Sequence, residues 1–143
     1  MKKTRKKNVV ARRLSGWAMH LANYLRNELW WSPSRATTQG WLCLHTLEAL
    51  GKGEVMLDFN KADGSRRIAR GTLCSGISEA FDNYEYKKKG GVKKDKDGVF
   101  TFCYWDLDEE GFRSFRAERL NDFLVVTQIA TPHFDLQSKK SQK

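Results

Sequence analysis

Apolar residues in the first third of the chain recur at the spacing of α-helices. Over residues 14–31 they follow one another at steps of three and four, which places them on one helix face. Ser32-Pro33-Ser34 interrupts the pattern, because the residue before a proline disfavours the helical conformation. A second helix is predicted over residues 35–50, or only from Gln39 if Gly40 delays its start.

From residue 53 the period changes to two, the period of a β-strand. Val55, Leu57 and Phe59 share one face of a first strand. The step Asp63-Gly64 suits a tight hairpin turn. The return strand is predicted over residues 66–73. Its alternation places Arg66, Ile68 and Arg70 on one face and Arg67, Ala69 and Leu73 on the other.

A second hairpin is predicted from strands at residues 99–107 and 112–116, joined by an acidic turn. A helical turn at 117–120 and a fifth strand at 124–129 follow. Five short strands with a helical turn before the last are typical of a small barrel, in which closure removes exposed strand edges. The predicted class is therefore α+β, with two N-terminal helices followed by a five-stranded SH3-like or Sm-like β-barrel.

These patterns divide the chain into segments of different character. We expect a basic disordered tail at 1–13, a helical segment at 14–51, a barrel at 52–130 that contains a long basic loop at 74–98, and a polar tail at 131–143. A helical turn near Ser78 to Phe81 is possible within the loop.

The net charge of +9 is concentrated in three of these stretches. Residues 1–13 hold seven Lys or Arg, residues 87–96 hold six Lys, and the last seven residues hold three Lys. The remainder of the chain contains ten basic and sixteen acidic side chains. Segregated positive charge favours contact with nucleic acid or with an acidic protein, and the alternative is that it only keeps a small protein soluble.

Several classes of protein fit the sequence poorly. No apolar run reaches the roughly 18 residues of a membrane span, and the basic start lacks the apolar stretch of a secretory signal. Three cysteines, Cys43, Cys74 and Cys103, do not suggest a disulfide framework. We therefore expect a cytoplasmic protein.

Four short strings carry a family resemblance. They are Asp63-Gly64, Ala69-Arg70-Gly71-Thr72-Leu73, Tyr104-Trp105-Asp106-Leu107 and the run from Phe112 to Leu120, Phe-Arg-Ser-Phe-Arg-Ala-Glu-Arg-Leu. Over about residues 40–125 the chain resembles WYL-type domains, and more closely the small WYL-like proteins of Bacteroidetes and their phages. The resemblance implies an Sm-like barrel that senses a ligand or binds nucleic acid, with Arg113 and Arg116 at its basic pocket.

Arginines on the hairpin strands are the first candidate binding residues. Arg66, Arg70, Arg113 and Arg116 carry planar guanidinium groups, which donate paired hydrogen bonds to phosphate. The alternative is that they pair with nearby carboxylates on a solvated surface. Aromatic neighbours such as Tyr104 and Trp105 would stack on bases if they were exposed, but they fit the core better.

The basic loop and the first helix supply two further candidate surfaces. Five lysines of the loop follow two tyrosines, and this combination of aromatic and basic residues is typical of proteins that bind single strands. The lysines are Lys87, Lys88, Lys89, Lys93 and Lys94. A solvated loop tip explains them equally well. Adjacent Trp30 and Trp31 cannot both point inward, so one is a candidate partner surface.

Metal and catalytic chemistry find little support. The acidic turn at 106–111 begins like a calcium loop, but Ala117 stands where the closing Glu is needed. Cys43 and His45 lack a second ligand pair for zinc, and no nucleophile motif accompanies the three histidines. We expect no cofactor, no metal and no enzymatic activity.

The sequence thus favours a non-enzymatic, nucleic-acid-binding accessory or regulatory module of bacterial or phage origin, with low sequence specificity. Two alternatives remain open. One is an adaptor that docks an acidic host or virion protein, and the other is a sensor of a small phosphorylated ligand in the barrel.

Overall fold

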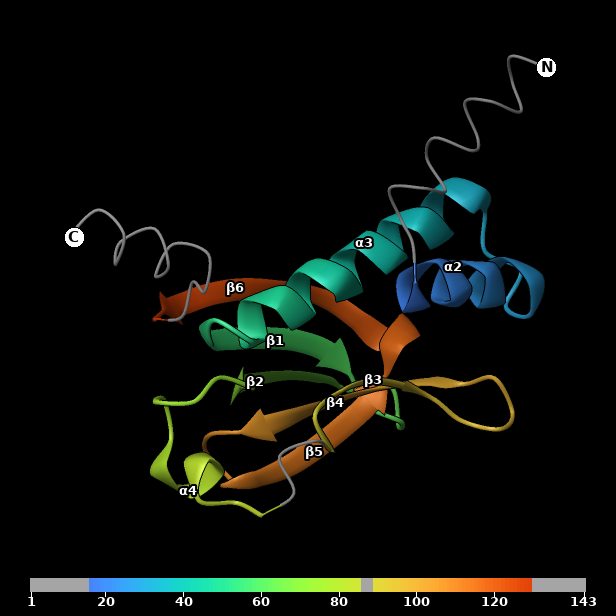
Figure 1. Ribbon diagram of the computed structural model, residues 1–143. Coiled ribbons are helices and arrows are strands. Elements are labelled where there is room, and N and C mark those ends of the chain that lie inside the picture. The colour runs from blue at the N-terminus through green and yellow to red at the C-terminus, as the bar shows by residue number, and fades with distance from the viewer. Residues whose placement is uncertain (1–15, 86–88, 130–143) are drawn as a thin grey trace, which may run out of the picture.

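The computed structural model describes residues 16–85 and 89–129 as two helices followed by a curled antiparallel sheet (Figure 1). The helices are α2 (Trp17–Asn27), α3 (Pro33–Leu50) and the short α4 (Glu79–Asp82). The strands are β1 (Gly53–Asn60), β2 (Arg66–Thr72), β3 (Gly91–Lys94), β4 (Phe100–Asp106), β5 (Gly111–Arg116) and β6 (Leu120–Gln128), with a 3-10 turn η2 (Ala117–Arg119) before β6. The predicted α+β class, with two N-terminal helices before an SH3-like or Sm-like barrel, is confirmed, and the sheet curls into a half-barrel.

Both N-terminal helices differ in length from the prediction. Helix α2 ends at Asn27, because Trp30 takes a left-handed φ of 62° and the Trp31 N–H bonds back to the Leu25 carbonyl at 3.0 Å. Helix α3 begins at Pro33, since proline fits the first helical position and the Ser32 hydroxyl accepts the Arg35 N–H at 3.2 Å.

The sheet runs in the order β3-β4-β2-β1-β6, and β5 pairs with β4. Its two hairpins follow the predicted alternation. Val55 lies opposite Gly71 and Leu57 opposite Ala69, so the apolar face of β1 meets the small residues of β2. Strand β4 pairs with β5 along its length, with β3 near its start and with only two residues of β2 near its end. This short β2–β4 contact is where the sheet curls.

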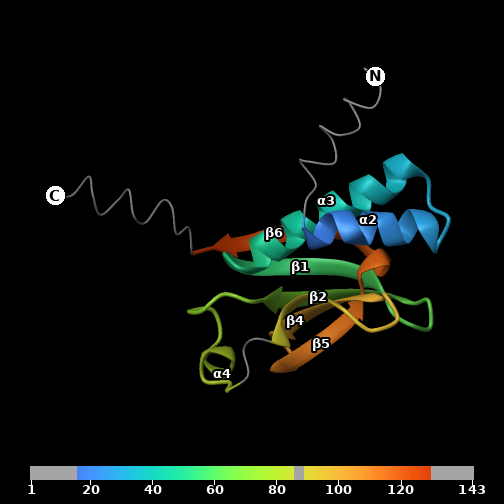
Figure 2. The same cartoon turned by 45° about the vertical axis from the view of Figure 1, so that its right-hand side comes forward.

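Aromatic rings fill the concave side of the sheet. Phe115 stacks on Phe59 with ring centroids 4.1 Å apart and on Phe102 at 5.2 Å. Helices α2 and α3 lie along the β1 and β6 side of this half-barrel (Figure 2). The Gln39 amide of α3 donates to the Ala117 and Leu120 carbonyls, both at 2.9 Å, which ties the helix to η2 and the start of β6.

The segment predicted as a loop over 74–98 contains regular structure. It forms α4, near the position anticipated for a helical turn, and the strand β3, which makes six strands in place of five. Glycines and lysines gave β3 no alternating pattern, and its conformation comes from pairing with β4, where Lys94 lies opposite Phe100. Strand β6 begins at Leu120, four residues earlier than predicted. The predicted tails at 1–13 and 131–143 lie outside the described residues.

Gly53 provides a test of the β1–β6 pairing. A Cβ atom there would overlap the backbone carbonyl of Thr127, whereas a Cβ on Gly111 would meet nothing within 4 Å. We expect Gly53→Ala to lower the free energy of unfolding by at least about 2 kcal/mol, because backbone cannot yield as a side chain can. Urea unfolding measures this. The control Gly111→Ala should change stability by less than about 0.5 kcal/mol, and equal effects would contradict the assigned pairing.

Candidate functional site

Two of the predicted arginines lie on the outer face of β2 and are paired with carboxylates. Arg66 Nε donates to Asp58 at 2.9 Å, and this hydrogen bond lowers the pKa of Asp58 below its usual value. Arg70 donates to Glu54 at 2.9 Å and to Asp108 at 2.8 Å. The structure therefore shows for this face the ion pairing that the sequence left open as the alternative. These two guanidinium groups do not converge with those of β5.

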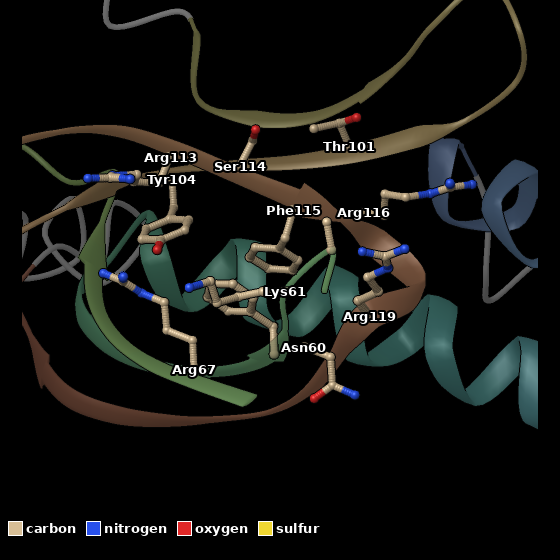
Figure 3. Close-up of a pocket in the computed structure, with 12 residues that line it drawn as sticks. Asn60, Lys61, Arg67, Thr101, Tyr104, Arg113, Ser114, Phe115, Arg116 and Arg119 are labelled. Atoms are coloured by element: carbon tan, nitrogen blue, oxygen red, sulfur yellow. The ribbon is translucent and has the colours of Figure 1, made fainter. Parts of the chain in front are cut away.

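A pocket of about 500 Å³ opens on the concave side of the half-barrel (Figure 3). Its wall carries five basic side chains and no acidic one, and these are Lys61, Arg67, Arg113, Arg116 and Arg119. Phe59, Tyr104 and Phe115 line the space between them. A concave surface with an aromatic base and only positive side chains suits an anion that carries a flat or apolar group.

The five basic residues reach the pocket from four parts of the chain, since Arg113 and Arg116 both belong to β5. Arg67 comes from the inner face of β2, where it lies opposite Phe59. Arg113, on β5, lies opposite Tyr104 of β4. Lys61 belongs to the turn after β1 and Arg119 to η2. Figure 3 shows Arg67 and Lys61 on one side of Phe115 and Arg119 on the other. The half-barrel thus gathers charges that are up to 58 residues apart in the chain.

A buried carboxylate holds Arg67 in place. Asp106 is fully buried, and it accepts hydrogen bonds from Arg67 Nη2 at 2.8 Å and from the Tyr104 hydroxyl at 3.3 Å. The backbone N–H groups of Asp108 and Glu109 also donate to it, both at 2.9 Å. Burial raises the pKa of Tyr104 above its usual value, so its hydroxyl remains a donor. Arg67 Nε is buried and has no hydrogen-bond partner among the described residues.

The other four charges of the pocket differ in how firmly they are held. Arg113 pairs with Glu109 at 3.0 Å, with both side chains half exposed. Such an exposed ion pair contributes only about 0–1 kcal/mol, so it can exchange for a stronger anion. Arg116 lies 2.7 Å from Glu118, whose side chain is only 11% exposed, and its Nη2 donates to the Tyr24 hydroxyl at 3.1 Å. Lys61 and Arg119 take part in no ion pair within residues 16–85 and 89–129.

The aromatic residues of the family-like motif are core residues. Tyr104 and Trp105 are 0% and 2% exposed. Tyr104 faces the concave side, and Trp105 faces the other side of β4, where Phe81, Tyr84 and Phe112 surround it. The interpretation of these residues as packing is confirmed, and base stacking on them is excluded by burial.

The lysine and tryptophan candidates lie away from the pocket. Lys89, Lys93 and Lys94 are exposed, while Lys87 and Lys88 lie outside the described residues. Trp30 is 89% exposed, whereas Trp31 packs against the core. The Arg35 guanidinium covers the ring of Trp31 at 3.8 Å. The two adjacent tryptophans therefore separate into one exposed and one packed side chain, as their positions required.

Sequence reasoning missed three of the five pocket charges. It named Arg113 and Arg116 but not Lys61, Arg67 or Arg119. Arg67 did leave a signal, since its alternation with Ala69 places it on the inner face of β2. Lys61 and Arg119 carried none, because a turn residue and a single 3-10 residue have no periodicity.

Other kinds of site find no support in residues 16–85 and 89–129. No three His, Cys, Asp or Glu side chains are grouped as metal ligands there. In the same part of the chain, no helix is long and apolar enough to cross a bilayer.

Asp106 and Asp108 form a matched pair for testing the pocket wall. We expect Asp106→Asn to destabilise the protein by about 3 kcal/mol, because a buried charge pair loses one partner. Asp108→Asn should cost less than about 1 kcal/mol, since this carboxylate is 56% exposed. Urea unfolding of both variants checks the difference. A cost for Asp106→Asn as small as that for Asp108→Asn would mean that the network does not support the wall.

Comparison with known proteins agrees with this architecture. The chain matches one family over residues 43–121, described as WYL_2, Sm-like SH3 beta-barrel fold. No curated protein and no solved structure matches it. The matched segment runs from the middle of α3 to the start of β6, and so contains all of the half-barrel except most of its last strand. This chain belongs to the WYL_2 family.

Proposed function

We propose that the protein is a non-enzymatic module that binds single-stranded nucleic acid with little sequence specificity, and that its basic pocket holds a backbone phosphate. The observation that carries this proposal is the pocket wall, with five cations and no carboxylate around a space of about 500 Å³. The setting we propose is a bacterial or phage cytoplasm, in an accessory or regulatory role.

The geometry of the pocket favours a phosphate over other anions. Guanidinium groups donate parallel hydrogen bonds to phosphate oxygens. Arg67 is already oriented by Asp106, and its side chain is 31% exposed. A preoriented donor loses little conformational entropy when a ligand arrives. The position on a concave surface favours a single strand, because a duplex is too wide to enter a pocket of this volume.

Two alternative functions have observations of their own. A sensor of a small phosphorylated ligand is favoured by the same pocket, whose volume suits one nucleotide-sized molecule. A protein adaptor is favoured by Trp30, because an indole exposed by 89% is a candidate hot spot for a partner. We place single-strand binding first, because the exposed lysines of β3 add positive charge beyond the pocket, where a longer strand would continue.

Fluorescence anisotropy with labelled single-stranded DNA and RNA tests the proposal. We expect affinity to fall with rising salt, with a slope in log–log form of about −0.7 for each phosphate contacted. Arg119→Ala should weaken binding several-fold and make the slope shallower by about 0.7, because a free cation of the pocket is lost. Arg66→Ala is the control, since it removes the same charge from the outer face, and it should change affinity less than twofold.

Three results would overturn the proposal. One is the absence of binding at low salt, and another is an affinity that does not respond to salt. The third is equal loss of affinity in Arg119→Ala and Arg66→Ala. If single nucleotides raised the melting temperature while oligonucleotides did not bind, the small-ligand sensor would replace it.

A further inference from the structure

A second pocket lies beside the first, between α2 and the β3–β4 hairpin. It has a volume of about 380 Å³. One wall is a face of α2 on which Asn23, Tyr24 and Asn27 lie three and four residues apart. The opposite wall comes from the hairpin, with Lys94, Asp97 and Phe100. Helix α2 lies outside residues 43–121, so this pocket depends on a helix beyond the part of the chain that matches the family.

The two pockets differ in chemistry. The second contains the amides Asn23 and Asn27, the carboxylates of Glu28 and Asp97, one lysine, Lys94, and His20. Neither the two amides nor the two carboxylates form a side-chain hydrogen bond or ion pair with another described residue. Two carboxylates beside a single lysine attract a phosphate less than the five basic side chains of the first pocket do, whereas amides and carboxylates together donate and accept hydrogen bonds at the edge of a base. The first pocket therefore suits phosphate and the second suits a nucleobase.

One contact joins the two pockets. Arg116 belongs to the wall of the first, and its Nη2 donates to the hydroxyl of Tyr24, in the wall of the second, at 3.1 Å. Thr101 of the first pocket directly follows Phe100 of the second pocket in the chain. Thr101 also lies opposite Arg116 in the sheet. A chain that leaves the basic pocket past Arg116 thus arrives at the Tyr24 ring.

We propose that this second pocket is a base subsite, which holds the nucleobase of a strand whose phosphate lies in the basic pocket. The inference rests on the proposed function. Asn27 and Glu28 present an amide and a carboxylate at the end of α2, and Asp97 presents a second carboxylate across the pocket. The Tyr24 ring, partly buried against Phe100 at a centroid distance of 6.1 Å, supplies an aromatic surface at its side.

The charges of this subsite make it selective among bases. A carboxylate is only an acceptor, so it favours bases that carry an exocyclic amino group. Adenine, cytosine and guanine carry one, and thymine and uracil present carbonyl oxygens in its place. With two carboxylates against the single ammonium group of Lys94, the subsite therefore favours these three bases over thymine and uracil, while the phosphate pocket remains indifferent to sequence. A weak base preference on a largely non-specific binder is the expected result.

Anisotropy with labelled oligo-dC, oligo-dT and an abasic oligomer of equal length tests the subsite. We expect oligo-dC to bind about tenfold more tightly than oligo-dT, a factor equivalent to about 1.4 kcal/mol. Asn27→Ala and Glu28→Gln should each reduce this ratio toward one. Asn27→Ala changes no charge, so it should leave the affinity for the abasic oligomer unchanged. The control is Asn83→Ala, which removes an exposed amide distant from both pockets and should preserve the ratio.

The outcomes separate this inference from the proposed function. If all three oligomers bind with equal affinity and salt still lowers that affinity, the base subsite is contradicted and phosphate binding stands. If Asn27→Ala also weakens the abasic oligomer, the second pocket holds backbone and the inference is overturned. If no oligomer binds at low salt, both proposals fail. Circular dichroism checks that Asn27→Ala is folded, which is expected because the residue is exposed and alanine favours helices.

Discussion

The carboxylate of Asp106 organises the open end of the half-barrel. It is fully buried at the end of β4, and it accepts hydrogen bonds from a guanidinium group, a phenol and two backbone amides. A buried carboxylate is tolerated only when its oxygens are satisfied in this way. The acceptor fixes the turn into β5 and draws Arg67 across the short β2–β4 contact. The pocket wall therefore depends on a charged group inside a largely apolar core.

The two faces of β2 give arginine two different roles. On the outer face, Arg66 and Arg70 lie beside carboxylates of β1, and each charge is largely neutralised by its neighbour. On the inner face, Arg67 lies opposite Phe59 and pairs with the buried Asp106, but no acidic residue lines the space in front of it. Alternation along one strand thus separates surface ion pairs from a site that attracts anions. Net charge alone does not describe this protein, because the position of each acid decides which bases remain available.

The N-terminal helices do more than cover the sheet. Helix α3 is tied to η2 and β6 through Gln39, and the Cys43 thiol also lies 3.4 Å from the Ala117 carbonyl. Burial of that thiol raises its pKa to about 12, as expected for a packing residue and not for a nucleophile. Helix α2 packs on α3 and brings Tyr24 to Arg116. The helices in this way extend the edge of the basic pocket with a second surface of different chemistry.

The sequence by itself determined the elements whose residues carry a strong local pattern. The alternation of Val55, Leu57 and Phe59, the Asp63-Gly64 turn and the helical turn before the last strand predicted an SH3-like or Sm-like barrel. Tertiary structure decided the features that leave no local pattern in the sequence. Strand β3 exists because it pairs with β4, and the five pocket charges gather because curling brings separate elements together. Whether an arginine is neutralised depends on a carboxylate in a neighbouring strand, and such contacts across long sequence distances have no periodicity that a sequence can reveal.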